Sequence, residues 1–164
     1  MNEMFGSASS FNQDISAWNY SNVTGIGLTK FLNATTAFTT ANYDLLLNAL
    51  SSGSTQNSVL LGAGSKQYTK TLVDSGTTDG AAALKLIQSG QNFLATVNIG
   101  DIILNTTDSV YCKVTAVDSN TQLSVDIAVP TGKAFEIYNS SAAKSRYNLT
   151  SVKLWTITDG GGIW

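Results

Sequence analysis

The 164-residue sequence contains no histidine and only one cysteine. Without histidine, the chain lacks the commonest general base and the commonest transition-metal ligand. Cys112 has no second cysteine with which to form an intrachain disulfide or a cysteine zinc site. Because Cys112 lies in the alternating run SVYCKVTAV, we interpret it as a small packed residue rather than a reactive thiol.

Charged residues are scarce as well. They make up 12% of the chain, which is about half the usual fraction. The nine Lys and Arg residues are scattered, and the net charge is −2. Since phosphate binding needs a concentrated basic surface, we do not expect nucleic acid as a partner. Ser, Thr, Asn and Gly take the place of charges, a composition common among extracellular and virion structural proteins.

The sequence also lacks long apolar runs. No stretch approaches the roughly 20 apolar residues of a membrane span. The N-terminal residues MNEMFGSASSF have neither the basic segment nor the apolar segment of a secretory signal. We therefore expect no signal peptide and no membrane insertion. If the protein works outside a cell, release of a virus by lysis is one way for it to get there.

Two segments near the start resemble each other, MFGSASSF at 4–11 and KFLNATTAF at 30–38. Phe5 of the first corresponds to Phe31 of the second, and Phe11 corresponds to Phe38. The spacing between corresponding positions suits solenoid repeats, in which each unit covers the apolar face of its neighbour. In such a repeat Trp18, Val23 and Ile26 would point inward.

The stretch MFGSASSFNQDISAWNYSNVT resembles the repeat of a leucine-rich-repeat-like surface protein family, first catalogued in mycoplasmas and widespread in bacterial surface proteins and marine viruses. The repeat reads Met-Phe, a small residue, Ser-Phe-Asn-Gln, Ile-Ser-x-Trp and Ser-Asn-Val-Thr. The matching positions are 4–5, 10–13, 15–16, 18 and 21–24. The chain contains one full unit of this repeat and part of a second.

The resemblance also covers the way in which this family ends its repeats. It implies a helix in TTANYDLLLNAL, 39–50, with Leu45, Leu46, Leu47 and Leu50 in its buried stripe. It implies a closing module made of VLLGAGSKQY, 59–68, and SAAKSRYNLTSVKLWTITDGG, 141–161. The chain between these two parts therefore looks inserted.

The inserted segment has period-two alternation and turn signals that predict short antiparallel strands. The predicted strands are 97–104, 109–118, 122–129 and 134–138, and 81–88 is a short helix or a strand. Four or five such strands fit a small barrel or sandwich. The stretch VNIGDIILNTTDSVYCKVTAVDSNTQLSVD is similar to a β module of phage and prophage structural proteins.

We therefore expect a mainly β protein with short helices, of the α+β class. A truncated leucine-rich-repeat-like solenoid and its closing module would occupy residues 1–70 and 139–164. A small antiparallel β barrel or sandwich, inserted between them, would occupy residues 71–138.

The sequence positions no catalytic, cofactor or metal site. Asp101, Asp108, Asp118 and Asp126 lie beside turns or strand ends, and no Asp-x-Asp-x-Asp-Gly loop occurs. Since calcium needs six or more converging oxygens, we interpret these aspartates as turn caps. The glycines at 160–162 lack the helix and lysine of a phosphate loop. An enzyme such as a depolymerase would need a convergent Asp/Glu pair.

Four aromatic residues could form a sugar-binding platform: Trp18, Tyr20, Tyr43 and Trp155. The resemblance places Trp18 and Trp155 in the core of the fold, which favours a structural role for these two. A surface role stays open for Tyr20.

The first repeat would present an apolar face and unpaired strand edges, which proteins normally cover. The chain could be a fragment of a longer solenoid, its N-terminal arm could fold over the edge, or another subunit could cover it. We favour the last alternative. The expected assembly residues are Phe5, Phe11, Trp18, Tyr20, Ile163 and Trp164.

Our functional hypothesis is a non-enzymatic virion structural protein of a phage or virus. It would be a homo-oligomeric decoration, tail-fibre-associated or adhesion component that packs against its own copies or other virion proteins. The alternative is a fragment of a bacterial cell-surface adhesin that binds host protein or glycan. Both hypotheses place the protein on a virion or another extracellular surface.

Overall fold

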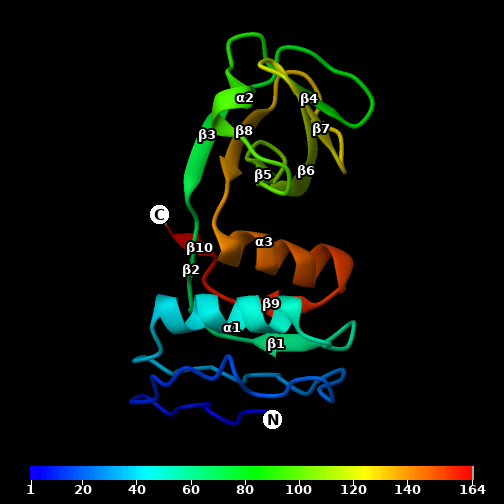
Figure 1. Ribbon diagram of the computed structural model, residues 1–164. Helices are drawn as coiled ribbons and strands as arrows, with labels where there is room; N and C mark the ends of the chain where they lie inside the picture. Colours follow the sequence, from blue (N-terminus) through cyan, green and yellow to red (C-terminus); the bar gives the residue numbers. More distant parts are fainter. Residues whose placement is uncertain (164) are drawn as a thin grey trace. The chain divides into compact units, whose positions relative to one another are not determined.

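The computed structural model describes the backbone of residues 1–163 and the side chains of residues 1–162. The chain is mainly β with a few short helices, as expected (Figure 1). It divides into two compact units. Unit 1 contains residues 1–69 and the chain from Ser141 onward, and unit 2 contains Lys70–Ser140.

Unit 1 begins with consecutive backbone turns in residues 1–38. Its helices are α1 Thr40–Ser52, α3 Ser141–Tyr147 and a π-helical turn, η1 Asn148–Val152. Its strands are β1 Leu60–Gly62, β2 Tyr68–Thr69, β9 Thr156–Thr158 and β10 Gly162–Ile163. All of these strands pair in parallel, β1 with β9 and β2 with β10.

Within residues 1–38, an early segment pairs with a later one, and several of the hydrogen bonds share the sequence offset that separates Phe5 from Phe31. Three backbone N–H groups donate to carbonyls at this offset: Glu3 to Thr29, Phe5 to Phe31 and Ser7 to Asn33, at 3.0, 3.1 and 2.8 Å. Leu28 in turn bridges Leu61 of β1 in parallel. Segments 3–7, 29–33, β1 and β9 therefore lie side by side in this order and run in the same direction (Figure 1).

Gly62 allows β1 to lie this close to the preceding segment. A Cβ atom at this position would overlap the backbone nitrogen of Lys30. The N–H of Leu32 donates to the carbonyl of Gly62 at 2.9 Å. The expected inward position of Ile26 is wrong, because this side chain is 66% exposed, and Leu28 is the fully buried residue nearby. In consecutive turns, buried and exposed side chains do not alternate with a fixed period. The sequence pattern therefore could not show that Leu28, and not Ile26, is buried.

Helix α1 covers the core of unit 1. Its cap is Thr39, whose side chain accepts a hydrogen bond from the backbone N–H of Asn42 at 3.3 Å. Its buried residues are Tyr43, Leu46, Leu47 and Leu50. Leu45 was expected in the same stripe, but it is 42% exposed because its position on the helix turns it to solvent.

A buried ion pair joins α1, α3 and the chain after β9. The side chain of Asp159 is 2% exposed and accepts hydrogen bonds from Nε and Nη2 of Arg146 at 2.9 and 3.0 Å. The Tyr43 hydroxyl donates to the same carboxylate at 2.9 Å. Burial alone would lower the pKa of Arg146, but the Asp159 carboxylate outweighs it and raises the pKa. Burial, together with Asp159, also raises the pKa of Tyr43.

Unit 2 is a six-stranded antiparallel sheet that curls on itself, with strand order β3-β8-β5-β6-β7-β4 (Figure 1). The strands are β3 Leu72–Thr77, β4 Lys85–Ile87, β5 Ile102–Asn105, β6 Val110–Ser119, β7 Gln122–Val125 and β8 Ala134–Tyr138. A short helix, α2 Phe93–Thr96, lies between β4 and β5 in the chain. A bridge between Gly80 and Ile87 connects β4 to the segment after β3.

The predicted strands of unit 2 agree with the structure to different degrees. The segment 134–138 is β8, and 109–118 is shifted by a single position from β6. The segment 81–88, left open as helix or strand, contains β4. Two predicted strands are too long, because β5 begins only at Ile102 and β7 ends at Val125.

The sheet of unit 2 encloses a core of buried residues that includes Cys112. Cys112 is 1% exposed, which confirms its interpretation as a packed residue. Where the chain enters and leaves this unit, the N–H of Asn139 donates to the carbonyl of Thr71 at 3.0 Å, so the two ends of the unit are adjacent. Among the described residues, no helix has the length and apolarity needed to cross a membrane.

Replacing Asp159 by Asn should lower the free energy of unfolding by about 3 kcal/mol, because it leaves the Arg146 guanidinium without its counter-charge. The matched control is Glu3→Gln, at an ion pair with Lys30 whose side chains are 56% and 60% exposed. This control should change stability little. Chemical denaturation measures both, and equal effects of the two variants would contradict the importance of the Asp159 pair.

Burial, with a smaller contribution from Asp126, raises the pKa of the Cys112 thiol to about 12. At pH 8 the thiolate should be about a thousand times rarer than for an unperturbed cysteine, so a disulfide reagent should label the native protein very slowly. The same protein in denaturant should react at the normal rate. Fast labelling of the native protein would show that unit 2 opens or that the thiol is accessible.

Candidate functional site

The structure brings together three of the expected assembly residues, Phe5, Phe11 and Trp18. The rings of Phe5 and Phe11 stack with centroids 3.8 Å apart and planes 12° apart. The ring of Trp18 lies 5.8 Å from that of Phe5. We call these three residues the aromatic cluster. Two of its rings are stacked, and the third is tilted against Phe5.

The aromatic cluster continues into the next segment through the same repeat. Phe5 lies 5.4 Å from Phe31, and Phe11 stacks on Phe38 at 5.7 Å. Phe31 and Phe38 are buried, whereas Phe5 and Phe11 are only partly so. Each phenylalanine of the first segment therefore covers a phenylalanine of the second.

The outer side of the aromatic cluster remains in contact with solvent. Trp18 is 41% exposed, and Met1 and Met4 are 39% and 51% exposed. The expected core position of Trp18 is therefore wrong. Its ring packs on the first segment, and among the described residues no segment pairs with the other side of residues 3–7.

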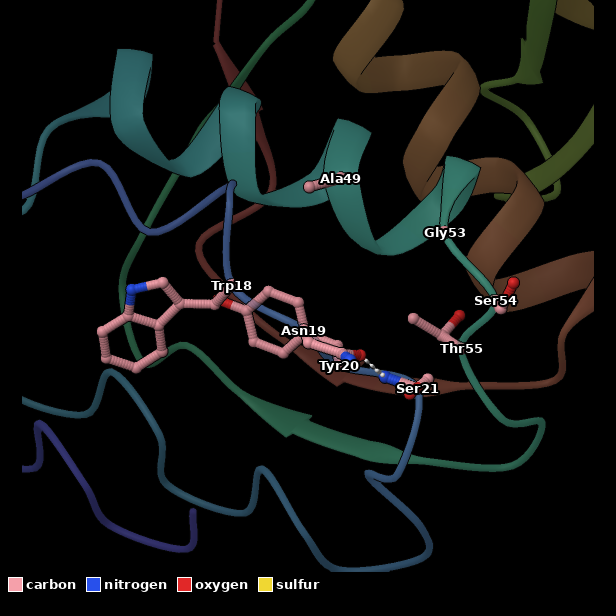
Figure 2. Close-up of a pocket in the computed structure, with 8 residues that line it drawn as sticks. All are labelled: Trp18, Asn19, Tyr20, Ser21, Ala49, Gly53, Ser54 and Thr55. Carbon is pink, nitrogen blue, oxygen red and sulfur yellow. Dashed lines mark hydrogen bonds between the residues drawn. The ribbon is translucent and has the colours of Figure 1, made fainter.

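A pocket of about 320 Å³ lies between residues 18–21 and the end of α1 (Figure 2). We call it the Asn19 pocket. Its lining residues are Trp18, Asn19, Tyr20, Ser21, Ala49, Gly53, Ser54 and Thr55. None of these side chains carries a charge at neutral pH, so the pocket offers hydroxyl, amide and backbone groups.

Two hydrogen bonds hold the loop that lines the Asn19 pocket. The Oδ1 atom of Asn19 accepts from the N–H of Ser21 at 2.9 Å (Figure 2). The Nε2 atom of Gln56 donates to the carbonyl of Ser21 at 3.0 Å, which ties the loop to the chain after α1. The loop is therefore positioned by the segment that forms the opposite wall.

Tyr20 lies inside unit 1 rather than on its surface. Its side chain is 4% exposed, and its hydroxyl donates to the carbonyl of Ile15 at 2.9 Å. Burial, with a contribution from Asp14, raises the pKa of this hydroxyl. The surface role left open for Tyr20 is therefore wrong, because its side chain is buried and its hydroxyl is bonded to Ile15.

The four aromatic residues considered as a sugar platform do not form one. Tyr43 is fully buried, and Trp155 is 3% exposed with its Nε1 donating to the carbonyl of Gln56 at 2.7 Å. Tyr20 is buried as well. Of the four, Trp18 is the exposed one, and it borders the Asn19 pocket.

A second groove, of about 330 Å³, crosses the parallel segments of unit 1. Its lining residues are Thr29, Lys30, Asn33, Leu60, Leu61, Gly62, Thr156 and Thr158. The one charged group in this lining, Lys30, forms an exposed ion pair with Glu3 at 3.0 Å. The groove combines leucine surface with hydroxyl groups.

The acidic side chains of unit 2 belong to separate local networks. Asp108 accepts from Nζ of Lys133 and Nδ2 of Asn105, each at 2.9 Å, and these bonds lower its pKa. Asp118 accepts from Nζ of Lys85 at 2.8 Å, which lowers its pKa. Within residues 1–162, no three His, Cys, Asp or Glu side chains gather as metal ligands.

Two of the expected assembly residues cannot be placed. The backbone of Ile163 belongs to β10, which pairs with β2. The side chain of Ile163 and the whole of Trp164 lie outside the described residues.

The polar residues of the Asn19 pocket were not predicted from the sequence. Asn19, Ser21, Ser54 and Thr55 are residue types that occur throughout this chain, so none of them stands out. The sequence signal that could have indicated them is their position, because residues 53–55 follow a helix and residues 19–22 follow a tryptophan. Only the fold shows that these two positions meet.

Residues 1–59 match the sequence model of a family described as a Mycoplasma protein of unknown function, DUF285. This match confirms the resemblance to the mycoplasma family for that part of the chain. No curated protein and no solved structure matches the chain.

Replacing Tyr20 by Phe should lower the free energy of unfolding by about 1 kcal/mol, because the carbonyl of Ile15 loses its buried donor. The control is Tyr111→Phe, at a partly buried residue of unit 2. Thermal denaturation measures the two variants. If Tyr20→Phe is as stable as the unmodified protein, this hydroxyl does not hold the loop in place.

Proposed function

We propose that this chain is a non-enzymatic structural protein of a phage or virus particle, which works by packing against other protein subunits. The observation that carries the proposal is the exposed apolar surface on the outer side of residues 3–7. There Trp18 and Met4 are exposed next to backbone that pairs on one side only among the described residues. Exposed apolar surface beside an open backbone edge is a feature of protein interaction sites.

We interpret the four parallel segments of unit 1 as rungs of a short leucine-rich-repeat-like solenoid. Three hydrogen bonds of equal sequence offset between the first two segments support this interpretation, as do the phenylalanine pairs at that offset or one residue more. A solenoid is stabilised by contacts between neighbouring repeats, so its end repeat requires a cover. In this proposal another subunit supplies the cover, and the protein is a homo-oligomer or part of a mixed assembly.

We base the virion setting on the resemblance of residues 97–126 to a β module of phage structural proteins. Unit 2 has the antiparallel sheet that such a module needs, and its two ends are adjacent. We interpret it as a domain inserted into the closing module of the solenoid and displayed on the particle. The function in the particle would be decoration, tail-fibre association or adhesion.

A second candidate function is a fragment of a bacterial cell-surface adhesin. The match of residues 1–59 to a family of Mycoplasma proteins favours it. In this case the exposed aromatic cluster would contact a further repeat of a longer polypeptide rather than another subunit. The partner would be a host protein or glycan.

The molar mass in solution, from light scattering behind a sizing column, tests the proposal. We expect a discrete multiple of 17.3 kDa or an open-ended polymer. Trp18→Arg should shift the protein to monomer, because it places a charge on the proposed contact. Leu45→Arg is the matched control, since Leu45 is 42% exposed on α1, and it should leave the mass unchanged.

A monomeric unmodified protein would overturn the assembly proposal and favour the adhesin fragment. An oligomer that Trp18→Arg leaves intact would place the subunit contact elsewhere and would contradict the role of the aromatic cluster.

A further inference from the structure

We propose that the Asn19 pocket binds one ring of a neutral oligosaccharide and that the exposed face of Trp18 holds the adjoining ring. The pocket subsite does not depend on assembly, whereas the Trp18 subsite is open only in the unassembled chain, because the same face of Trp18 belongs to the proposed subunit contact. Pockets for small molecules measure about 300–1,000 Å³, so a volume of about 320 Å³ suits a single sugar ring.

The lining of the Asn19 pocket fits the hydroxyl groups of a sugar. Asn19 contributes an amide, and Ser21 and Ser54 contribute hydroxyls, whereas the Thr55 hydroxyl already donates to the carbonyl of Leu50 and accepts from Lys153. Hydroxyl and amide groups both donate and accept, as sugar hydroxyls do. The end of α1 forms one wall, where the carbonyls of Ala49 and Leu50 already accept hydrogen bonds from Gly53 and Thr55, so the side chains of the lining are the groups that meet a ligand.

The charges near the pocket favour a neutral ligand. The lining side chains are uncharged, and the nearby ammonium of Lys153 is turned to the protein. Its Nζ atom donates to the carbonyl of Gly53 at 2.9 Å and to the Thr55 hydroxyl at 2.8 Å. Because these groups already use the ammonium, it is a poor partner for a sulfate or carboxylate ligand.

Trp18 provides an apolar surface next to the polar pocket. Its indole points away from Asn19 and Ser21, toward the first segment (Figure 2). The pocket and the indole are therefore neighbouring subsites rather than two walls of the same one. The negative face of an aromatic ring attracts the weakly positive C–H groups of a sugar ring, and the Trp18 side chain is 41% exposed.

The loop that joins the two subsites is held in place without a ligand. The Asn19–Ser21 and Gln56–Ser21 hydrogen bonds fix the backbone between them. Tyr20 of the same loop is buried, and its hydroxyl donates to the carbonyl of Ile15. A loop that is already ordered loses little entropy when a ligand binds, which raises affinity for a small neutral molecule.

The test is a titration of the full chain with maltotriose, cellotriose and chitotriose, followed by saturation-transfer NMR and tryptophan fluorescence. At least one of them should bind, with a Kd of about 0.1–1 mM. Trigalacturonic acid, an acidic trisaccharide, should bind more weakly than the best neutral one. If none of the neutral probes binds, or if the acidic one binds best, the proposal is wrong.

Three variants locate the binding. Ala49→Phe should fill the pocket and weaken binding at least about tenfold, and Trp18→Ala should weaken it by a similar factor. Ile26→Ala is the control, because Ile26 is 66% exposed and does not line the pocket. Circular dichroism confirms that each variant is folded.

Binding that persists in Ala49→Phe would place the sugar elsewhere and overturn the assignment. The molar mass of Ala49→Phe separates this test from the assembly test. If Ala49→Phe no longer binds the sugar but keeps the molar mass of the unmodified protein, the substitution affects sugar binding and not assembly.

Discussion

Parallel backbone pairing around β1 is the constraint on which the rest of unit 1 depends. β1 lies between segment 29–33 and β9, so it joins residues that precede the second unit to residues that follow it. The pairing requires a glycine at position 62, because a side chain there would overlap the neighbouring backbone. Pairing of the same kind, one segment further out, places Phe5 on Phe31. The position of the exposed aromatic cluster therefore follows from the register in which the backbone segments pair.

A second set of interactions fixes the helices to this parallel layer. The carboxylate of Asp159 contacts Arg146 of α3 and Tyr43 of α1, so one buried group links both helices to the chain after β9. Asn48 of α1 adds neutral bonds, donating to Ser141 at 3.2 Å and accepting from Ser145 at 2.8 Å. These contacts join the part of unit 1 that precedes unit 2 to the part that follows it. Unit 1 can therefore close although the whole of unit 2 intervenes in the sequence.

The sequence predicted what depends on repetition and alternation. The two Phe-containing segments indicated the offset at which the turns pair, and alternation located β8 and the buried Cys112. It failed where burial depends on a distant partner. Trp18 is exposed because no described segment pairs outside residues 3–7, and Tyr20, only five residues from the carbonyl that accepts its hydroxyl, is buried without any periodic signal. The strand β3 and the polar Asn19 pocket have no periodic apolar signal, so only the fold reveals them.

The scarcity of charge links the fold to both proposed contacts. Amides and hydroxyls make many of the connections that ion pairs make elsewhere, as in the bond from Nδ2 of Asn42 to Oδ1 of Asn12 at 2.8 Å. A neutral hydrogen-bonding surface loses less solvation energy than a charged one when another molecule covers it. A face of this kind can pack against a protein subunit without matched counter-charges. The Asn19 pocket is built from the same neutral groups, and this suits it to a neutral hydroxylated ligand.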